Sequence, residues 1–164
     1  PTNSSTFSHT RTLNNEEITL LNDWINSGMP EGNPTNAPAP PVYPPEEITN
    51  PDLVLQIPTY TSQATSGDDY VCFPIQNPLN YDTWITSFEV VPGNKSIVHH
   101  VLMFQDDNQS PGGYYTCFGG TGGASDYMSS YTPGQFADVF PDGMGIKLRA
   151  NTTVILQLHY RIAC

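Results

Sequence analysis

The pattern of hydrophobic and polar positions predicts one helix near the start of the chain. Four apolar side chains recur at spacings of three and four, the period of an amphipathic helix: Ile18, Leu21, Trp24 and Ile25. Asn14 stands just before them with Glu17 three residues later, which is the sequence of a capping box, and Gly28 follows as a stop signal. We therefore expect a helix over residues 15–27.

The period is lost in residues 30–51, where eight of 22 residues are proline. Proline lacks a backbone N–H and restricts its own backbone, so this stretch can sustain neither a helix interior nor a ladder of strand hydrogen bonds. We interpret it as an extended connector. The pattern thus predicts three parts: a helical segment at 1–29, the connector at 30–51 and a domain at 52–164.

The third part has the alternation and the short apolar runs of β-strands, separated by turn residues. The predicted strands lie in residues 52–58, 68–75, 82–92, 96–105, 112–120 and 152–162. In residues 82–92, Trp84, Thr86, Phe88 and Val90 share one face while Ile85 lies on the other. Residues 152–162 are apolar enough to be a central strand. Six to eight short strands in about 110 residues are typical of a β-sandwich.

Composition supports an all-β class and excludes two kinds of partner. The 164 residues include 16 prolines and 13 glycines, and only 13% are charged. Five basic against 16 acidic residues give a net charge of −11, which repels nucleic acids and anionic membranes. The chain contains no apolar run of ~20 residues. Its three cysteines allow one disulfide and one odd thiol.

Two of the four histidines, His99 and His100, are adjacent inside an apolar strand. Imidazoles are common ligands of zinc and copper. Neighbouring residues of a regular strand point to opposite faces, so both can reach one ion only at a twist, a bulge or a strand end. His159 lies in another predicted strand and is the third candidate ligand. The alternative is that all three are ordinary structural residues, and Met103 and Met144 are weaker candidates because methionine mostly fills cores.

Several motifs in order resemble the N-terminal domain of the copper type II, ascorbate-dependent monooxygenases, a family that includes peptidylglycine α-hydroxylating monooxygenase and dopamine β-monooxygenase. The motifs are "YVCF" at 70–73, "EVVPGNKSIVHHVLMF" at 89–104, "YYTC" at 114–117, Pro-Gly at 133–134, "PDGMGIKL" at 141–148 and "LQLHY" at 156–160. The resemblance implies an antiparallel jelly-roll sandwich and one electron-transfer copper bound by His99, His100 and His159. It also implies a disulfide between Cys72 and Cys117, and hence a periplasmic or secreted protein.

The resemblance implies partners as well. In that family a second domain supplies two histidines and a methionine to the copper that activates oxygen, whereas His9 is the only further histidine here. Residues 7–32 resemble the closing helix of a bacterial c-type cytochrome module, although the C-x-x-C-H motif that attaches heme is missing. The alternative for this helix is that its Trp24 face packs on the sandwich. The partner of Cys164 stays open.

Three readings of the function therefore stand at this point. The first is the electron-transfer half of a copper monooxygenase, and the second is a copper binder or carrier without a catalytic partner. The third is an interaction sandwich without metal. The paired acidic residues at 46–47, 68–69 and 106–107 are assigned to solvated turns with no acid or base role.

Overall fold

The computed structural model describes residues 12–40, 48–64, 67–123 and 125–162. The chain divides into two compact units, Pro1–Val42 and Tyr43–Cys164. Among the described residues, no helix has both the length and the apolar character needed to span a bilayer.

The first unit contains helix α1 (Asn15–Asn26), which confirms the predicted helix. The capping box is formed: Glu17 N donates to Asn14 Oδ1 at 2.9 Å, and Asn14 N donates to Glu17 Oε2 at 2.8 Å. Gly28 follows the helix with a φ of +88°, a conformation that glycine adopts without strain. A short 3-10 turn, η1 (Pro34–Asn36), interrupts the proline-rich stretch. The helix buries none of its residues, so its apolar face is exposed in the structure.

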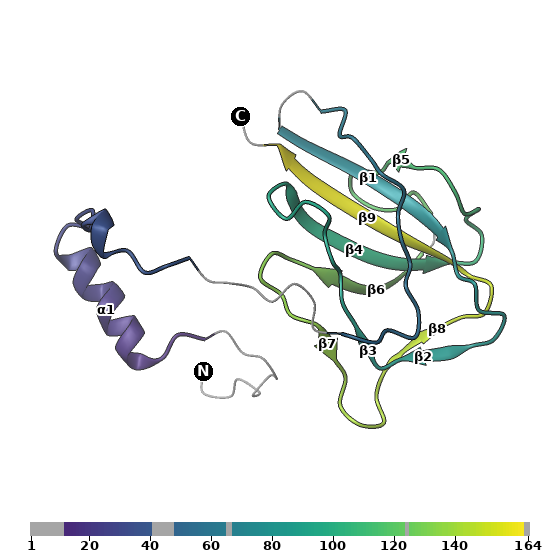
Figure 1. The fold of residues 1–164 in the computed structure, drawn as a ribbon, viewed down its shortest axis with the longest axis horizontal. Coiled ribbons are helices and arrows are strands. Elements are labelled where there is room, and N and C mark those ends of the chain that lie inside the picture. The colour runs from purple at the N-terminus through teal and green to yellow at the C-terminus, as the bar shows by residue number, and fades with distance from the viewer. Residues whose placement is uncertain (1–11, 41–47, 65–66, 124, 163–164) are drawn as a thin grey trace. The chain divides into compact units, whose positions relative to one another are not determined.

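The second unit is built on one five-stranded antiparallel sheet in the order β5-β1-β9-β4-β6 (Figure 1). Its strands are β1 (Gly67–Gln76), β4 (Val98–Asp106), β5 (Tyr115–Thr116), β6 (Asp126–Tyr131) and β9 (Thr153–Ile162). Two small sheets pair β2 (Thr83–Ile85) with β8 (Ile146–Leu148), and β3 (Ser87–Phe88) with β7 (Asp138–Val139). The all-β class of this part and the central position of β9 are confirmed. Jelly-roll connectivity stays a prediction.

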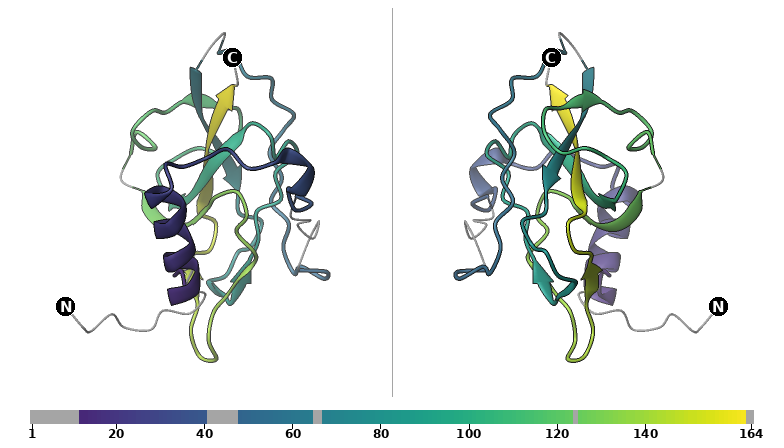
Figure 2. Two further views of the ribbon diagram at one scale, coloured as in Figure 1. Left: turned by 90° about the vertical axis from the view of Figure 1, so that its left-hand side faces the viewer. Right: turned by 90° about the vertical axis from the view of Figure 1, so that its right-hand side faces the viewer.

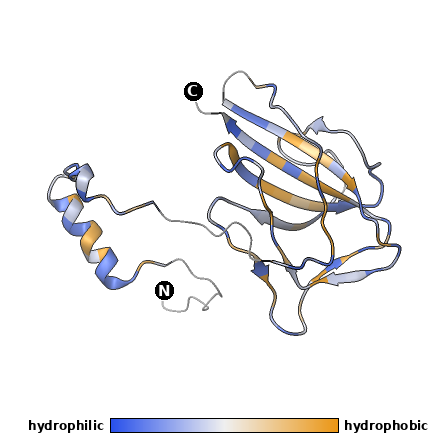
Figure 3. Cartoon of the chain, viewed as in Figure 1, coloured by the Kyte–Doolittle hydropathy of each residue, from blue (hydrophilic) through white to orange (hydrophobic). Residues whose placement is uncertain are grey.

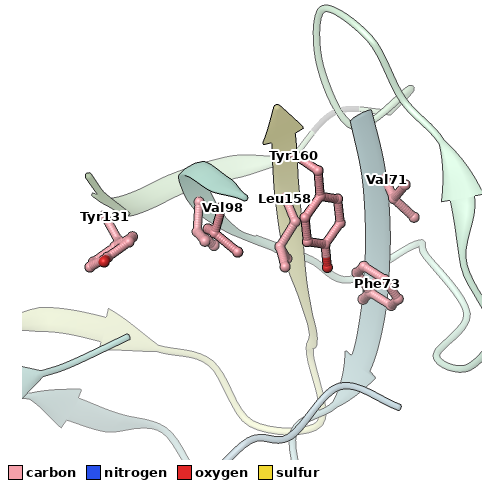
Figure 4. Packing of buried hydrophobic residues seen from close by; sticks show 7 residues of the cluster. Val71, Phe73, Val98, Tyr131, Leu158 and Tyr160 are labelled. Atoms are coloured by element: carbon pink, nitrogen blue, oxygen red, sulfur yellow. The ribbon is translucent and has the colours of Figure 1, made fainter. Parts of the chain in front are cut away.

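The main core lies on one face of the large sheet, and a smaller buried cluster of Cys72, Cys117 and Ile155 lies on the other. Buried side chains from four strands form its main cluster: Val71, Phe73, Val98, Val101, Tyr131, Leu158 and Tyr160. Figure 4 shows Val98, Leu158, Tyr160 and Phe73 on the same side of their strands. A second cluster around Met128, Leu148 and Val154 joins the large sheet to β2 and β8. Both faces of β9 are buried: Leu158 and Tyr160 lie in the main cluster, while Ile155 and Gln157 are buried on the opposite face. Figure 3 shows the mixture of hydrophobic and hydrophilic residues along this strand.

Three strand predictions are wrong in detail. In residues 112–120 only Tyr115–Thr116 (β5) form a strand. Residues 52–58 form no ladder, although Leu53, Leu55 and Ile57 pack on the core and Val54 between them is exposed. In the part of the chain that the structure describes, no strand pairs with this segment. Residues 82–92 form two short strands, β2 and β3, that pair with different partners.

Candidate metal centre

A β-bulge brings the adjacent histidines to the same place. In the β4–β9 ladder, Val98 pairs with Tyr160 and His100 pairs with His159, so His99 is one extra residue on β4. Val98 therefore reaches the core together with Val101, while His100 points to the opposite face beside His159. The bulge resolves the difficulty that consecutive strand residues diverge.

The three imidazoles converge through their Nδ1 atoms. His100 Nδ1 lies 3.2 Å from His99 Nδ1 and 3.2 Å from His159 Nδ1. All three ligand atoms lie within 4.8 Å of one another. The ring centroids of the three pairs are 4.6 to 5.5 Å apart, with steep angles between the ring planes. The three rings are therefore close together and steeply inclined to one another.

These distances fit one metal ion. Two nitrogens that each lie ~2.0 Å from an ion at a tetrahedral angle are about 3.3 Å apart, close to the observed 3.2 Å. A neutral imidazole has a single N–H, so at most some of these Nδ1 contacts can be hydrogen bonds. Three imidazole nitrogens this close together can form the donor set of a cation site.

The cluster lies at the edge of the buried region. His159 is buried, His100 is partly buried and His99 is exposed, so an ion can approach from the His99 side. Burial lowers the pKa of His100, and the neighbouring His159 and His99 lower it further. A neutral His100 is the form that binds a metal, because a protonated ring nitrogen has no lone pair to donate.

Strand β1 supplies a second layer of contacts that we did not foresee from the sequence. Tyr70 pairs with His159 in register, and its ring stacks on the imidazole with centroids 4.1 Å apart and planes 9° apart. Phe118, which is exposed, meets the Tyr70 ring edge to face at 4.9 Å. Asp68 Oδ1 lies 3.0 Å from His159 Nε2.

The interpretation of Asp68 and Asp69 as a solvated pair in a turn is wrong, because both lie in β1. They point to opposite faces: Asp69 accepts hydrogen bonds from Tyr60 and Ser62, whereas Asp68 approaches the histidines. The signal for this was the alternation of β1, which places Asp68, Tyr70 and Cys72 on one face. What the sequence did not reveal was the register with β9.

The same face carries the disulfide. Cys72 and Cys117 are bonded, with 5.8 Å between their Cα atoms. Gln157, two residues before His159 on β9, donates to Cys117 O at 2.7 Å and to Gly120 O at 3.2 Å. The bond and the amide together hold the loop that carries Phe118 against the sheet.

The structure does not bring either candidate methionine to the histidines. Met103 packs with Leu156 and the core cluster around Met128, on the opposite face of the sheet. Met144 is exposed in the loop between β7 and β8. His9 and Cys164 lie outside the described residues.

No protein-family profile matches this sequence, and a search of curated proteins gives no significant match. The geometry of the histidines therefore carries the weight of any functional argument.

Proposed function

We propose that the second unit is a copper-binding domain that holds one ion on His99, His100 and His159. We further propose that it is the electron-transfer half of a copper-dependent monooxygenase-like protein. The observation that carries the proposal is the cluster of three imidazoles whose ligand atoms lie within 4.8 Å of one another, with His100 Nδ1 3.2 Å from both His99 Nδ1 and His159 Nδ1.

The choice of copper rests on the donor set. An all-imidazole site suits copper and zinc, and divalent copper generally binds a given site more tightly than zinc does. A bound copper ion would supply one-electron exchange between Cu(I) and Cu(II). Three neutral ligands accommodate both charges, and no carboxylate is among them. The partly exposed His99 leaves a side of the site open to a redox partner.

The resemblance supports the family role. The positions that match its motifs are those that meet in space: the histidine pair with "LQLHY", and the two cysteines in the disulfide. A disulfide of this kind favours an oxidising compartment, so we place the protein in the periplasm or outside the cell. In this proposal a second copper domain, where oxygen is activated, is the partner, and a c-type cytochrome module is a possible further one.

Metal binding by the purified, metal-free chain tests the proposal. We expect one copper per chain, a higher melting temperature with the metal bound, and reversible reduction by ascorbate with the copper retained. His100→Ala and His159→Ala should each weaken binding by more than ~100-fold, the largest loss seen when only an outer-shell partner is removed. His9→Ala is the matched control, because His9 is the one histidine outside the proposed site.

The possible results separate the three readings. Equal copper binding by the wild type and His100→Ala, or tighter binding of Zn²⁺ than of Cu²⁺, would contradict the copper site. Copper that binds but cannot be cycled by ascorbate would favour a carrier over an electron-transfer domain. If no metal changes the melting temperature, the third hypothesis, an interaction sandwich without metal, would be favoured.

A further inference from the structure

His159 is the only one of the three histidines that is buried, and its two ring nitrogens have different surroundings. Nδ1 faces His100 Nδ1 at 3.2 Å, inside the cluster. Nε2 is buried and has no hydrogen-bond partner among the described residues. Asp68 Oδ1 lies 3.0 Å from Nε2 but outside hydrogen-bond alignment.

A buried N–H without a partner carries a free-energy cost, because it has lost its hydrogen bonds to water. If Nδ1 donates its lone pair to an ion, the ring proton must be on Nε2, because a neutral imidazole carries only one. The Asp68 side chain is 50% exposed and has room to turn, so alignment of its oxygen with the Nε2–H axis removes that cost. Coordination through Nδ1 therefore places the ring proton on Nε2, where Asp68 can accept it.

The orientation of the ring is determined from the same strand. Tyr70 follows Asp68 by two residues on β1, and its ring lies parallel to the imidazole of His159. Stacking restricts the plane of the ring, and a contact at Nε2 restricts its rotation within that plane. β1, which contributes no ligand, would then control how β9 presents its ligand.

We propose that Asp68 is a positioning residue of the metal centre: it accepts the Nε2–H of His159, selects Nδ1 as the ligand atom and favours the more highly charged ion. This inference rests on the proposed copper site. A carboxylate behind a histidine ligand makes that ligand a stronger donor, and such partners typically change metal affinity by about 10–100-fold. The added negative charge stabilises Cu(II) more than Cu(I).

Three substitutions separate the hydrogen bond from the charge. Asp68→Ala removes both, Asp68→Asn keeps an acceptor oxygen without the charge, and Asp68→Glu keeps both on a longer side chain. Asp142→Asn is the matched control: it removes one exposed negative charge in the loop between β7 and β8, which Figure 2 shows at the end of the unit away from the C-terminal end of β9.

The experiment measures Cu(I) and Cu(II) affinities, the midpoint potential and the melting temperature of the metal-free chain. For Asp68→Ala we expect Cu(II) affinity to fall about 10–100-fold and Cu(I) affinity to fall less. The midpoint potential then rises by about 59 mV for each tenfold change in the ratio of the two affinities. Asp68→Asn should raise the potential while losing less affinity, and Asp68→Glu should restore most of both. The metal-free melting temperatures should agree with that of the wild type.

Other results overturn the inference. If the wild type binds copper and Asp68→Ala binds both ions with unchanged affinities and potential, Asp68 has no positioning role although the copper site stands. If Asp142→Asn shifts the copper affinities and the midpoint potential as much as the Asp68 variants do, the effect comes from net charge and not from the position of Asp68. A wild-type chain that binds no copper would overturn the proposed function and this inference together.

Discussion

The two faces of the five-stranded sheet are built on different principles. Along β9, Leu158 and Tyr160 enter the hydrophobic core, while Gln157 and His159 point to the other face. The core face requires apolar side chains of suitable volume. The opposite face combines a smaller buried cluster around Ile155 with individual contacts: a disulfide, a buried amide and the histidine cluster. The first face therefore carries the larger hydrophobic core, and the second carries the groups that could bind a ligand.

The largest effect on stability should come from the core face. Phe73 is fully buried at 0% exposure, whereas Phe118 on the opposite face is 79% exposed. Phe73→Ala should lower the free energy of unfolding by about 3–5 kcal/mol because it removes buried area and leaves a cavity. Phe118→Ala should change it by less than ~0.5 kcal/mol. Urea unfolding of both variants makes the comparison, and equal losses would show that the contacts of Phe118 stabilise the domain as much as those of Phe73.

The disulfide on the second face should stabilise the fold by restricting the unfolded chain. Replacing both Cys72 and Cys117 with Ala should cost about 2–4 kcal/mol, mainly because the unfolded chain regains the entropy that a 45-residue separation had restricted. Both proteins, with and without the disulfide, should also carry Cys164→Ala, so that a free thiol cannot exchange with the disulfide. Urea unfolding without reductant measures the difference. A loss below ~1 kcal/mol would mean that Gln157 and the loop contacts suffice without the bond.

The register of β9 with its neighbours separates what the sequence predicts about the fold and the site from what it cannot predict. Its apolar run indicated a central strand, and the motifs brought His159 and the histidine pair together. The contact of Asp68 with His159 could not be predicted, because it joins residues 91 positions apart in sequence through a register that only the folded sheet determines. Residues 52–58 show the converse: alternation indicates which side chains are buried, but it does not reveal whether a neighbouring strand exists.

The smallest effect should come from the edge of the core, where Tyr60 O–H donates to Asp69 Oδ2 at 2.9 Å. Burial, followed by the hydrogen bond to Asp69 and the charge of Asp69, raises the pKa of Tyr60 to about 12. The folded pKa therefore exceeds the ordinary value of 10.0. This contribution to stability is fully present below pH 10 and is lost as pH rises toward 12.

Tyr60→Phe should cost about 1 kcal/mol at neutral pH and remove part of the alkaline loss. Urea unfolding between pH 8 and pH 11.5 measures both, with the exposed Tyr81→Phe as control. Burial also raises the pKa values of Tyr131 and Tyr160, so some alkaline loss should remain in the variant. An unchanged alkaline slope would mean that Tyr60 does not contribute to it.

The bulge at His99 has a consequence for how such a site can arise. Without this residue, Val98, His100 and Val101 would alternate as in any regular strand, with both valines in the core. One inserted codon is therefore enough to add a third imidazole to a cross-strand pair, and the inserted side chain displaces no core residue. A sheet of this design could gain or lose a metal ligand during evolution without a change in the residues of its core.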